Sequence, residues 1–420
     1  MNAHAAAQGA AALPLAGRDV ALLHPAWHSC GTYRVVLGQI AAYRALGARV
    51  APIAICDLPG FVPERKWRWR AFVQATPELS QGERWFGGAP FRSFVAPAFL
   101  RDVLWPYLHG DQALIRSGIS ERARLSPELE ERRFDLVHCN HFFLMPVAQR
   151  LARGRAPILL DTHDLQARQF ALMNARALLL PPRVGYEEML RRELAAMREA
   201  DLLLHLNAEE YDDFRALLPE KAHALLYPSA PEAPLGPGGP DILLVASNNS
   251  ANVESVVWFL REVFGRAGLP HVRIVGSVDA GVRSREPALY RAVEPCFLGR
   301  VEDPAAVYAS ARLVLLPTIS GHGLSIKTVE AMASGLPLIA TSHAFRGMRA
   351  DPGALDNVTI ADDAESFAKA LREAAADAYI PTPEERAASD TRRFYDENFS
   401  LRSYERRLAA LAPTLLREGR

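Results

Sequence analysis

The chain has 420 residues, enough for two or three domains that each bury their own core. Its 48 Lys and Arg residues balance its 48 Asp and Glu residues, and this zero net charge argues against a nucleic-acid-binding protein, which needs a strong positive field. The four cysteines lie far apart without the spacing of a zinc site, so we expect free thiols in a cytoplasmic protein.

The first half of the chain has the pattern of a parallel α/β domain. Residues 1–18 form an Ala-rich tail that we expect to be disordered, and residues 19–229 are expected to form the domain. Short apolar runs alternate with amphipathic segments, as in a parallel sheet covered by helices. The glycine triplet of dinucleotide-binding folds is absent, so we do not expect NAD binding. The predicted strands are Val20–His24, Val50–Ile55, Leu136–His138, Ile158–Asp161, Leu202–Leu206 and Ala224–Tyr227.

Polar or glycine residues follow several of these strands. Gly31 precedes a helix of about fifteen residues, and it either shapes a tight turn or lets a ligand approach the backbone. His163 follows a buried strand, where ligands bind in such sheets, and Asp164 is placed to orient its imidazole; a plain core histidine is the alternative. His138 and His141 have the spacing of a metal pair, but no third ligand stands nearby, so we expect them to line a cleft or the core.

A basic and aromatic segment follows the second strand. Trp67, Trp69 and Phe72 interleave with arginines and a lysine. Two interpretations fit: contact with an acceptor or a lipid head group, or a solvated helix that packs both tryptophans into the domain.

Residues 230–240 are rich in Pro and Gly and are expected to form an interdomain linker. The α/β alternation then starts again in residues 241–396, which we expect to be a second domain. Residues 397–420 carry an amphipathic helical pattern. The strands predicted in the second domain are Ile242–Ala246, Val272–Gly276, Cys296–Gly299, Leu313–Leu316, Leu338–Thr341 and Val358–Ile360.

The segment Pro317–Thr341 is the most informative part of the second domain. Gly321 and Gly323 follow an apolar strand and permit a tight turn, after which we expect a helix from about Leu324 to Ser334. The free N–H groups and positive dipole end of such a helix suit a phosphate. Lys327 and Glu330 are three residues apart, so they share one face of this helix.

This segment resembles the donor-sugar motif of the retaining GT-B glycosyltransferases of the group 1, or family-four, class. The family motif has a glutamate, seven residues and a second glutamate before Ala-Met-Ala-x-Gly-x-Pro. Glu330 matches the second glutamate, which in the family holds the nucleotide ribose, whereas His322 stands where the family has the first, which contacts the donor sugar. The resemblance implies the GT-B fold: two doubly wound Rossmann-like domains with the active site in the cleft between them, acceptor on the first and donor on the second.

The resemblance also assigns roles outside the motif. It places His163 near the donor sugar or the reaction centre and Gly31 near the donor phosphate or the acceptor. Many family members carry an arginine and a lysine in the loop that here contains Ser247 and Asn248, so Lys327 would carry more of the phosphate charge. It also implies that the C-terminal helix packs back on the first domain. The remaining donor-binding candidates are Gly299 and Val301 around the base and Gly323, Leu324 and Ser325 at the phosphate.

These features predict a metal-independent retaining glycosyltransferase. It would move a sugar from a nucleotide-diphosphate sugar to a glycan, lipid-linked or small-molecule acceptor, without a cofactor, in the cytoplasm or at the inner face of the membrane. The candidate catalytic residues are His163, Lys327 and Glu330. No Asp-x-Asp motif stands at a strand end to hold a metal. The alternative is a degenerate, non-catalytic binding subunit, because His322 and the uncharged loop at Ser247 depart from the family pattern.

Overall fold

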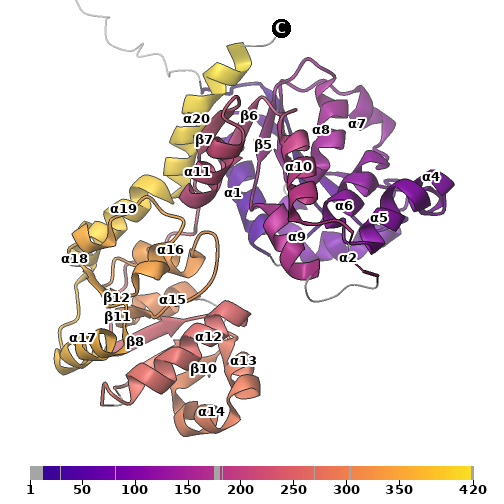
Figure 1. Cartoon of the computed structure of the whole chain (residues 1–420). Helices are drawn as coiled ribbons and strands as arrows, with labels where there is room; N and C mark the ends of the chain where they lie inside the picture. Colours follow the sequence, from indigo (N-terminus) through magenta and orange to yellow (C-terminus); the bar gives the residue numbers. More distant parts are fainter. Residues whose placement is uncertain are drawn as a thin grey trace, which may run out of the picture. The chain divides into compact units, whose positions relative to one another are not determined.

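The chain forms two compact units, each built around one parallel sheet, in a computed structural model that describes residues 13–417 except 29, 81, 175–179, 182, 269 and 302–303 (Figure 1). The N-terminal unit comprises residues up to Leu206, Tyr211–Leu226 and Tyr404 onward. The C-terminal unit comprises Asn207–Glu210 and Tyr227–Ser403. This arrangement confirms the two α/β sheets predicted from the sequence.

The sheet of the N-terminal unit has seven parallel strands in the order β3-β2-β1-β4-β5-β6-β7. The six predicted strands are present, with ends shifted by no more than two residues. The strands are β1 (Asp19–Pro25), β2 (Arg49–Cys56), β3 (Trp85–Gly88), β4 (Leu136–Asn140), β5 (Ile158–Asp161), β6 (Leu202–His205) and β7 (Ala222–Leu225).

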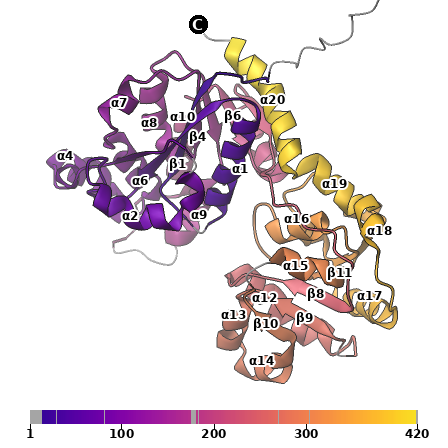
Figure 2. The same cartoon turned by 180° about the vertical axis from the view of Figure 1, so that it is seen from behind.

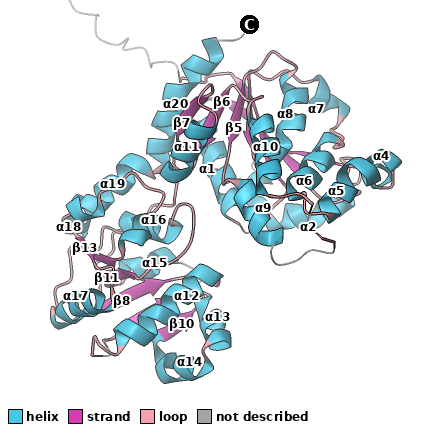
Figure 3. Cartoon of the chain, viewed as in Figure 1, coloured by secondary structure: helices cyan, strands magenta, loops and turns pink. Residues whose placement is uncertain are grey.

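Helices cover both sides of this sheet (Figure 3). Neighbouring strand residues enter different cores: Leu22 packs in one apolar cluster and Leu23 in the other, as expected for strands buried on both faces. The helices along this part of the chain are α1 (Gly31–Ala45), α2 (Lys66–Ala75), η1 (Pro77–Ser80), α3 (Phe91–Phe94), α4 (Pro97–Phe99), η2 (Leu100–Leu104), α5 (Trp105–Leu108), α6 (Gln112–Glu121), α7 (Pro127–Glu131), η3 (Phe142–Leu144), α8 (Met145–Ala152), α9 (Gln166–Asn174), α10 (Tyr186–Met197) and α11 (Ala208–Leu217).

Both ends of the described chain pack into the N-terminal unit. The last helix, α20 (Leu401–Arg417), buries Tyr404 and Leu408 in the same apolar cluster as Tyr43 of α1 (Figure 2). Leu15 also belongs to this cluster, and its backbone N–H donates to the carbonyl of Leu46 at 3.0 Å. The predicted disordered tail, residues 1–18, was therefore too long, because Leu15 is a core residue. Residues 1–12 of that tail lie outside the described residues.

The sheet of the C-terminal unit has six parallel strands in the order β10-β9-β8-β11-β12-β13. These strands are β8 (Asp241–Val245), β9 (Val272–Val275), β10 (Phe297–Gly299), β11 (Ala311–Leu316), β12 (Leu338–Ala340) and β13 (Val358–Ile360). The helices are α12 (Ser250–Trp258), η4 (Phe259–Phe264), α13 (Val278–Arg285), α14 (Pro287–Val293), η5 (Glu294–Cys296), α15 (Pro304–Ala309), α16 (Ile326–Ala333), η6 (Ser342–Phe345), η7 (Pro352–Ala354), α17 (Ala364–Ala376), α18 (Pro383–Ala388) and α19 (Asp390–Asn398).

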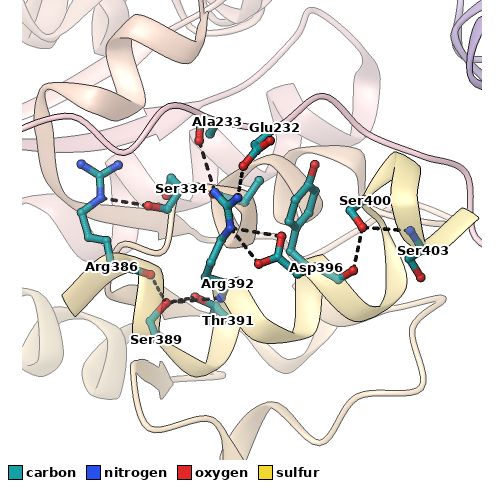
Figure 4. Close-up of polar contacts among 12 residues, drawn as sticks. Glu232, Ala233, Ser334, Arg386, Ser389, Thr391, Arg392, Asp396, Ser400 and Ser403 are labelled. Carbon is teal, nitrogen blue, oxygen red and sulfur yellow. Dashed lines mark hydrogen bonds and ion pairs between the residues drawn. The ribbon is translucent and has the colours of Figure 1, made fainter. Parts of the chain in front are cut away.

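Two buried arginines fix the Pro- and Gly-rich segment 230–240 within the C-terminal unit. Arg392 of α19 donates to the carbonyls of Ala233 (3.3 Å) and Ala333 (2.8 Å) and pairs with Glu232. Arg386 of α18 donates to the carbonyls of Gly236 and Ser334, both at 2.9 Å. Figure 4 shows Arg386 bonded to Ser334 and Arg392 reaching Ala233 and Glu232. Their charges therefore serve the fold, because backbone and carboxylate oxygens occupy their donors.

The two tryptophans of the basic and aromatic segment lie in different environments, which neither sequence interpretation anticipated. Trp69 is 1% exposed and packs against Phe61, Phe72 and Phe86, whereas Trp67 is 69% exposed. Residues two apart on a helix point to different sides, so α2 places one ring in the core and the other in solvent. Trp69 is thus excluded as a surface contact.

Among the described residues, none of the helices is both long and apolar enough to cross a membrane.

We therefore expect Trp69→Ala and Trp67→Ala to differ in stability. Loss of the buried ring should lower the free energy of unfolding by roughly 3–5 kcal/mol, whereas loss of the exposed ring should change it by no more than about 0.5 kcal/mol. Urea denaturation followed by circular dichroism measures both. Equal effects would mean that the helix is rotated about its axis relative to the structure described here.

Candidate active site

Both sheets place their first strand beside their fourth, β1 beside β4 and β8 beside β11. The chain leaves the two strands of such a pair in opposite directions, so the loops at their carboxyl ends part and leave a crevice where ligands bind. Most predicted site residues lie in such a loop or in the helix that follows it, whereas His163 follows β5 and Gly299 and Val301 lie at the end of β10. Gly31 and His163 belong to the N-terminal unit and the other candidates to the C-terminal unit.

In the C-terminal unit, two glycines shape the loop between β11 and α16. Gly321 has φ 120° and Gly323 has φ 67°, conformations that residues with a Cβ rarely adopt. The loop ends at Ser325, the N-cap of α16. Within the described part of the chain, the amides of Ser325, Ile326 and Lys327 have no hydrogen-bond acceptor. The loop therefore presents free N–H donors at the positive end of a helix, as the sequence predicted.

Lys327 is held beside this loop by a neutral partner. Its Nζ donates to Oδ1 of Asn252 at 2.9 Å. The side-chain Nδ2 of Asn252 in turn donates to the carbonyl of Ser247 at 3.1 Å. Burial, with a contribution from the positive charge of Arg346, lowers the pKa of Lys327 to about 8. The N-cap of α12 is Asn249, whose Oδ1 accepts from the backbone N–H of Asn252 at 2.8 Å. Asn252 connects the β8 loop to the lysine.

The remaining donor candidates surround the same crevice. Ser247 and Asn248 are exposed after β8, and the backbone N–H of Asn248 donates to Ser277 Oγ at 3.0 Å. Gly299 ends β10 with φ 67°, and Val301 follows it. The carboxyl ends of parallel strands meet at one sheet edge, so these groups lie on the side of the sheet where the glycine loop begins.

Glu330 and His322 flank the lysine. Glu330 lies in α16 on the face of Lys327 and is only partly buried, and its charge adds to the effect of burial in raising the pKa of Tyr308. His322 is exposed in the glycine loop. Both side chains are accessible to a ligand in the crevice.

In the N-terminal unit, two histidines stand at the ends of neighbouring strands in a strained backbone conformation. His141 follows β4 with φ 73°, and His163 follows β5 with φ 60°. Positive φ costs about 1–3 kcal/mol for such residues and clusters at functional sites. Their rings stack with centroids 4.0 Å apart and an angle of 13°. His141 also reaches Thr32 Oγ1 at the start of α1 (3.3 Å), beside Gly31.

An amide network fixes the tautomer of His163. Asn140 donates through Nδ2 to the carbonyl of Leu23 and to Gln39 Oε1, both at 3.0 Å, so its Oδ1 faces Nε2 of His163 at 2.8 Å. An amide oxygen only accepts, so Nε2 carries the proton and Nδ1 keeps a lone pair. Asp164 was expected to orient this imidazole, but Asn140 performs that role.

Burial keeps the histidines neutral. It lowers the pKa of His163 to about 3, and that of His141 lies well below its usual range for the same reason. The neighbouring carboxyl of Asp161, which accepts from Gln39 Nε2 at 2.9 Å, has its pKa raised to about 8 by burial. His163 is therefore a neutral hydrogen-bonding group at pH 7. His138, the other half of the considered metal pair, is bonded to Tyr43 Oη at 2.9 Å in the core.

A cavity of about 450 Å³ opens at the carboxyl ends of β1 and β2, and the sequence analysis did not anticipate it. Its walls are mainly aromatic, with one carboxylate: Trp27 Nε1 donates to Asp57 Oδ2 at 3.2 Å. Gly31 follows the cavity-lining Cys30, and a Cβ at Gly31 would meet only open space. The walls include Trp27, Asp57, Leu58, Phe61, Trp69 and Phe72.

Comparison with known proteins identifies the class of this site. Residues 239–377, which contain the Lys327 loop, match the family of glycosyl transferases group 1. A phosphatidyl-myo-inositol mannosyltransferase from Mycolicibacterium smegmatis is 27% identical over 275 residues, which make up 63% of this chain and 68% of that protein. The chain is a glycosyltransferase with a group 1 domain in its second half.

Solved structures show the fold of this glycosyltransferase. Anabaena Alr3699/HepE, crystallised with UDP, superposes with a TM-score of 0.58 and 13% identity over 94% of this chain and 100% of that one. TarM superposes with a TM-score of 0.61 and 9% identity over 95% and 99% of the two chains. The glycosyltransferase therefore has the GT-B fold, as the resemblance implied.

The pKa of Lys327 predicts how anion binding by the glycosyltransferase depends on pH. The lysine is a cation well below pH 8 and loses its charge as the pH rises through that value. We therefore expect the affinity for UDP or GDP to be steady near pH 7 and about tenfold lower at pH 9. Isothermal titration calorimetry measures this directly. The isosteric variant Lys327→Met should bind weakly at pH 7 and show little pH dependence; a parent affinity that stays constant to pH 9 would contradict the assignment.

Proposed function

We propose that this glycosyltransferase is a metal-independent retaining enzyme that transfers a sugar from a nucleotide-diphosphate sugar. The observation that carries the proposal is the juxtaposition of Lys327 with the free amides at the start of α16, beside the β8–β11 crevice. Within the described residues Lys327 has no carboxylate partner, and a positive side chain of this kind next to helix N–H donors suits a diphosphate. The UDP bound to HepE, which shares the fold, supports a nucleotide donor.

The chemistry follows from where negative charge develops. As the glycosidic bond breaks, the diphosphate leaving group gains charge, and fixed donors that already point at it stabilise that state. The Lys327 ammonium and the amides near Ser325 would serve this purpose in place of a divalent metal. Glu330 would accept hydrogen bonds from the nucleotide ribose, and His322 would contact the donor sugar. Gly323 and Leu324 would let the backbone approach the phosphates.

Retention of configuration needs no carboxylate nucleophile if the acceptor attacks from the face of the departing diphosphate. In that mechanism His163 acts as a fixed hydrogen-bond acceptor for a substrate hydroxyl. Its Nε2–H is committed to Asn140, so the lone pair on Nδ1 is its remaining polar group. Its neutral state, enforced by burial, suits this role better than that of a general acid.

The aromatic cavity supports an acceptor with a sugar or polyol head group. Flat rings such as those of Trp27 and Phe72 stack on the apolar faces of sugars, and Asp57 can accept from hydroxyls. The Mycolicibacterium relative is named for an inositol lipid, which supports a lipid-linked acceptor here.

A peripheral membrane contact fits the same acceptor. Large exposed apolar side chains gather between residues 58 and 105 of the N-terminal unit, and exposed basic residues accompany them. The apolar ones are Leu58, Trp67, Phe91, Val95, Leu100 and Trp105; the basic ones include Arg65, Lys66, Arg70 and Arg92. Anionic head groups attract such basic residues while apolar rings enter the interface.

A second candidate function is a non-catalytic subunit that binds nucleotide or glycan. It is favoured by His322 in place of the family glutamate and by the uncharged loop of Ser247 and Asn248. In this case the site would bind a nucleotide sugar but leave it intact.

A transfer assay with UDP- and GDP-sugars and an inositol or glycolipid acceptor distinguishes the two. We expect a glycoside whose anomeric configuration, read by NMR, equals that of the donor, with a rate unaffected by EDTA. Lys327→Ala and Glu330→Ala should each weaken donor binding roughly ten- to a hundredfold without unfolding the protein. Donor binding without transfer or hydrolysis would favour the subunit. A strict requirement for manganese or magnesium would contradict metal independence.

Sedimentation with vesicles that contain anionic lipid tests the membrane contact. The double variant Trp67→Ala/Phe91→Ala should bind at least about fivefold more weakly, because two exposed rings no longer enter the interface. Tyr379→Ala removes a comparably exposed aromatic ring from the C-terminal unit and should have no effect. If the parent chain does not sediment with these vesicles, the proposed contact is wrong.

A further inference from the structure

Arg346 lies against the glycine loop from the neighbouring strand. It follows η6, in the loop after β12, and its Nη2 is 2.9 Å from the position that a Cβ on Gly321 would occupy. Glycine at position 321 is thus required twice, by the positive φ of the loop and by the guanidinium packed on it. The side chain is partly buried beside the loop that contains His322 and leads into the helix of Lys327.

The guanidinium is only partly satisfied by the protein. Its Nη1 donates to the carbonyl of His343 at 3.3 Å, and its Nε is buried without a partner. Within the residues that the structure describes, Arg346 has no carboxylate within ion-pair distance. Glu209 is near enough to raise the pKa of Arg346 against the effect of burial, but one of its oxygens accepts from the Gly347 amide at 3.2 Å.

Other buried arginines of this unit differ in this respect. Arg386 and Arg392 use their donors on backbone carbonyls, and Arg392 also pairs with Glu232 and Asp396. Arg346 and Lys327 instead form a pair of partly desolvated cations near one another, and the positive charge of the arginine disfavours that of the lysine. Two positive charges held close together in a partly desolvated site repel each other, and a bound anion offsets this repulsion.

We propose that Arg346 is the second cationic ligand of the donor diphosphate, opposite Lys327 across the glycine loop. The inference rests on the proposed function of this site. A guanidinium offers several donors in a plane and can hold two phosphate oxygens, which the compact lysine ammonium cannot. Arg346 thereby supplies, from the β12 loop, the charge that is missing from the loop of Ser247 and Asn248 after β8. It also adds a contact to the leaving group as its charge develops.

Calorimetry of Arg346→Gln with a series of nucleotides tests this role. The probes are uridine, UMP and UDP, or the guanosine series if the parent prefers GDP. The ratio of the affinity for the diphosphate to the affinity for the nucleoside should be roughly ten- to a hundredfold smaller in Arg346→Gln than in the parent. The affinity for the nucleoside itself should change little. Arg349→Gln is the matched control, three residues further along the same loop and exposed, and it should behave as the parent. A purely structural arginine would weaken all ligands alike.

One further variant makes every outcome decisive. Arg346→Lys keeps the positive charge but lacks the planar guanidinium, so it should recover part of the gain in affinity for the diphosphate. If Arg346→Gln fails to fold, Arg346→Lys is compared with the parent in its place. An unchanged gain in a folded Arg346→Gln protein would overturn the inference while leaving the proposed function intact. If the parent binds neither UDP nor GDP, the proposed function is wrong and the inference fails with it.

Discussion

The hydrogen bond from Lys327 Nζ to Asn252 Oδ1 joins the first turns of α16 and α12, the helices that follow the two loops at the crevice of the C-terminal unit. An amide oxygen orients the ammonium without neutralising it, whereas a carboxylate would form an ion pair and remove the net charge. The positive field therefore remains available to a ligand. The geometry depends on residues that never meet that ligand, since Asn249 caps α12 and thereby sets the position of Asn252.

The N-terminal unit has a crevice at the same point of its sheet, but different chemical groups line it. Its crevice contains neutral imidazoles, and Asn140 and Gln39 form an amide network that holds His163. A buried network of this kind is stable only when each member finds a partner, so it resists rearrangement. The left-handed backbone at His141 and His163 persists because this network and the ring stack determine it. The two crevices thus differ in chemistry: that of the C-terminal unit contains the Lys327 cation, and that of the N-terminal unit contains a rigid, neutral hydrogen-bonding group at His163.

The sequence predicted the features that depend on periodicity and on glycine. Apolar runs located six strands in each half, and the spacing of Gly321, Gly323 and Gly335 located the loop and the end of α16. Strand β3 was missed because Trp-Phe-Gly-Gly is short and half glycine, so it lacks a strand signature. The different environments of Trp67 and Trp69 could have been predicted, because residues two apart do not share a helix face.

Contacts between distant segments could not be read from the pattern. Asn140, Gln39 and His163 lie on separate elements, and Arg346 reaches Gly321 from another strand. Such partners are set by strand order and register, which a single sequence does not encode locally. The aromatic cavity was hidden for the same reason, because its walls come from the ends of β1 and β2 and from α2.

The return of the chain to the N-terminal unit at Tyr404 has a consequence for synthesis. The core of that unit includes Tyr404 and Leu408, so it stays incomplete until the whole C-terminal unit and Leu408 have been translated. Domains usually fold as they leave the ribosome, N-terminal first, but here the N-terminal sheet must wait with the apolar face around Tyr43 exposed. A nascent chain in that state is a substrate for chaperones, and any premature stop before α20 would release a protein whose first domain cannot close.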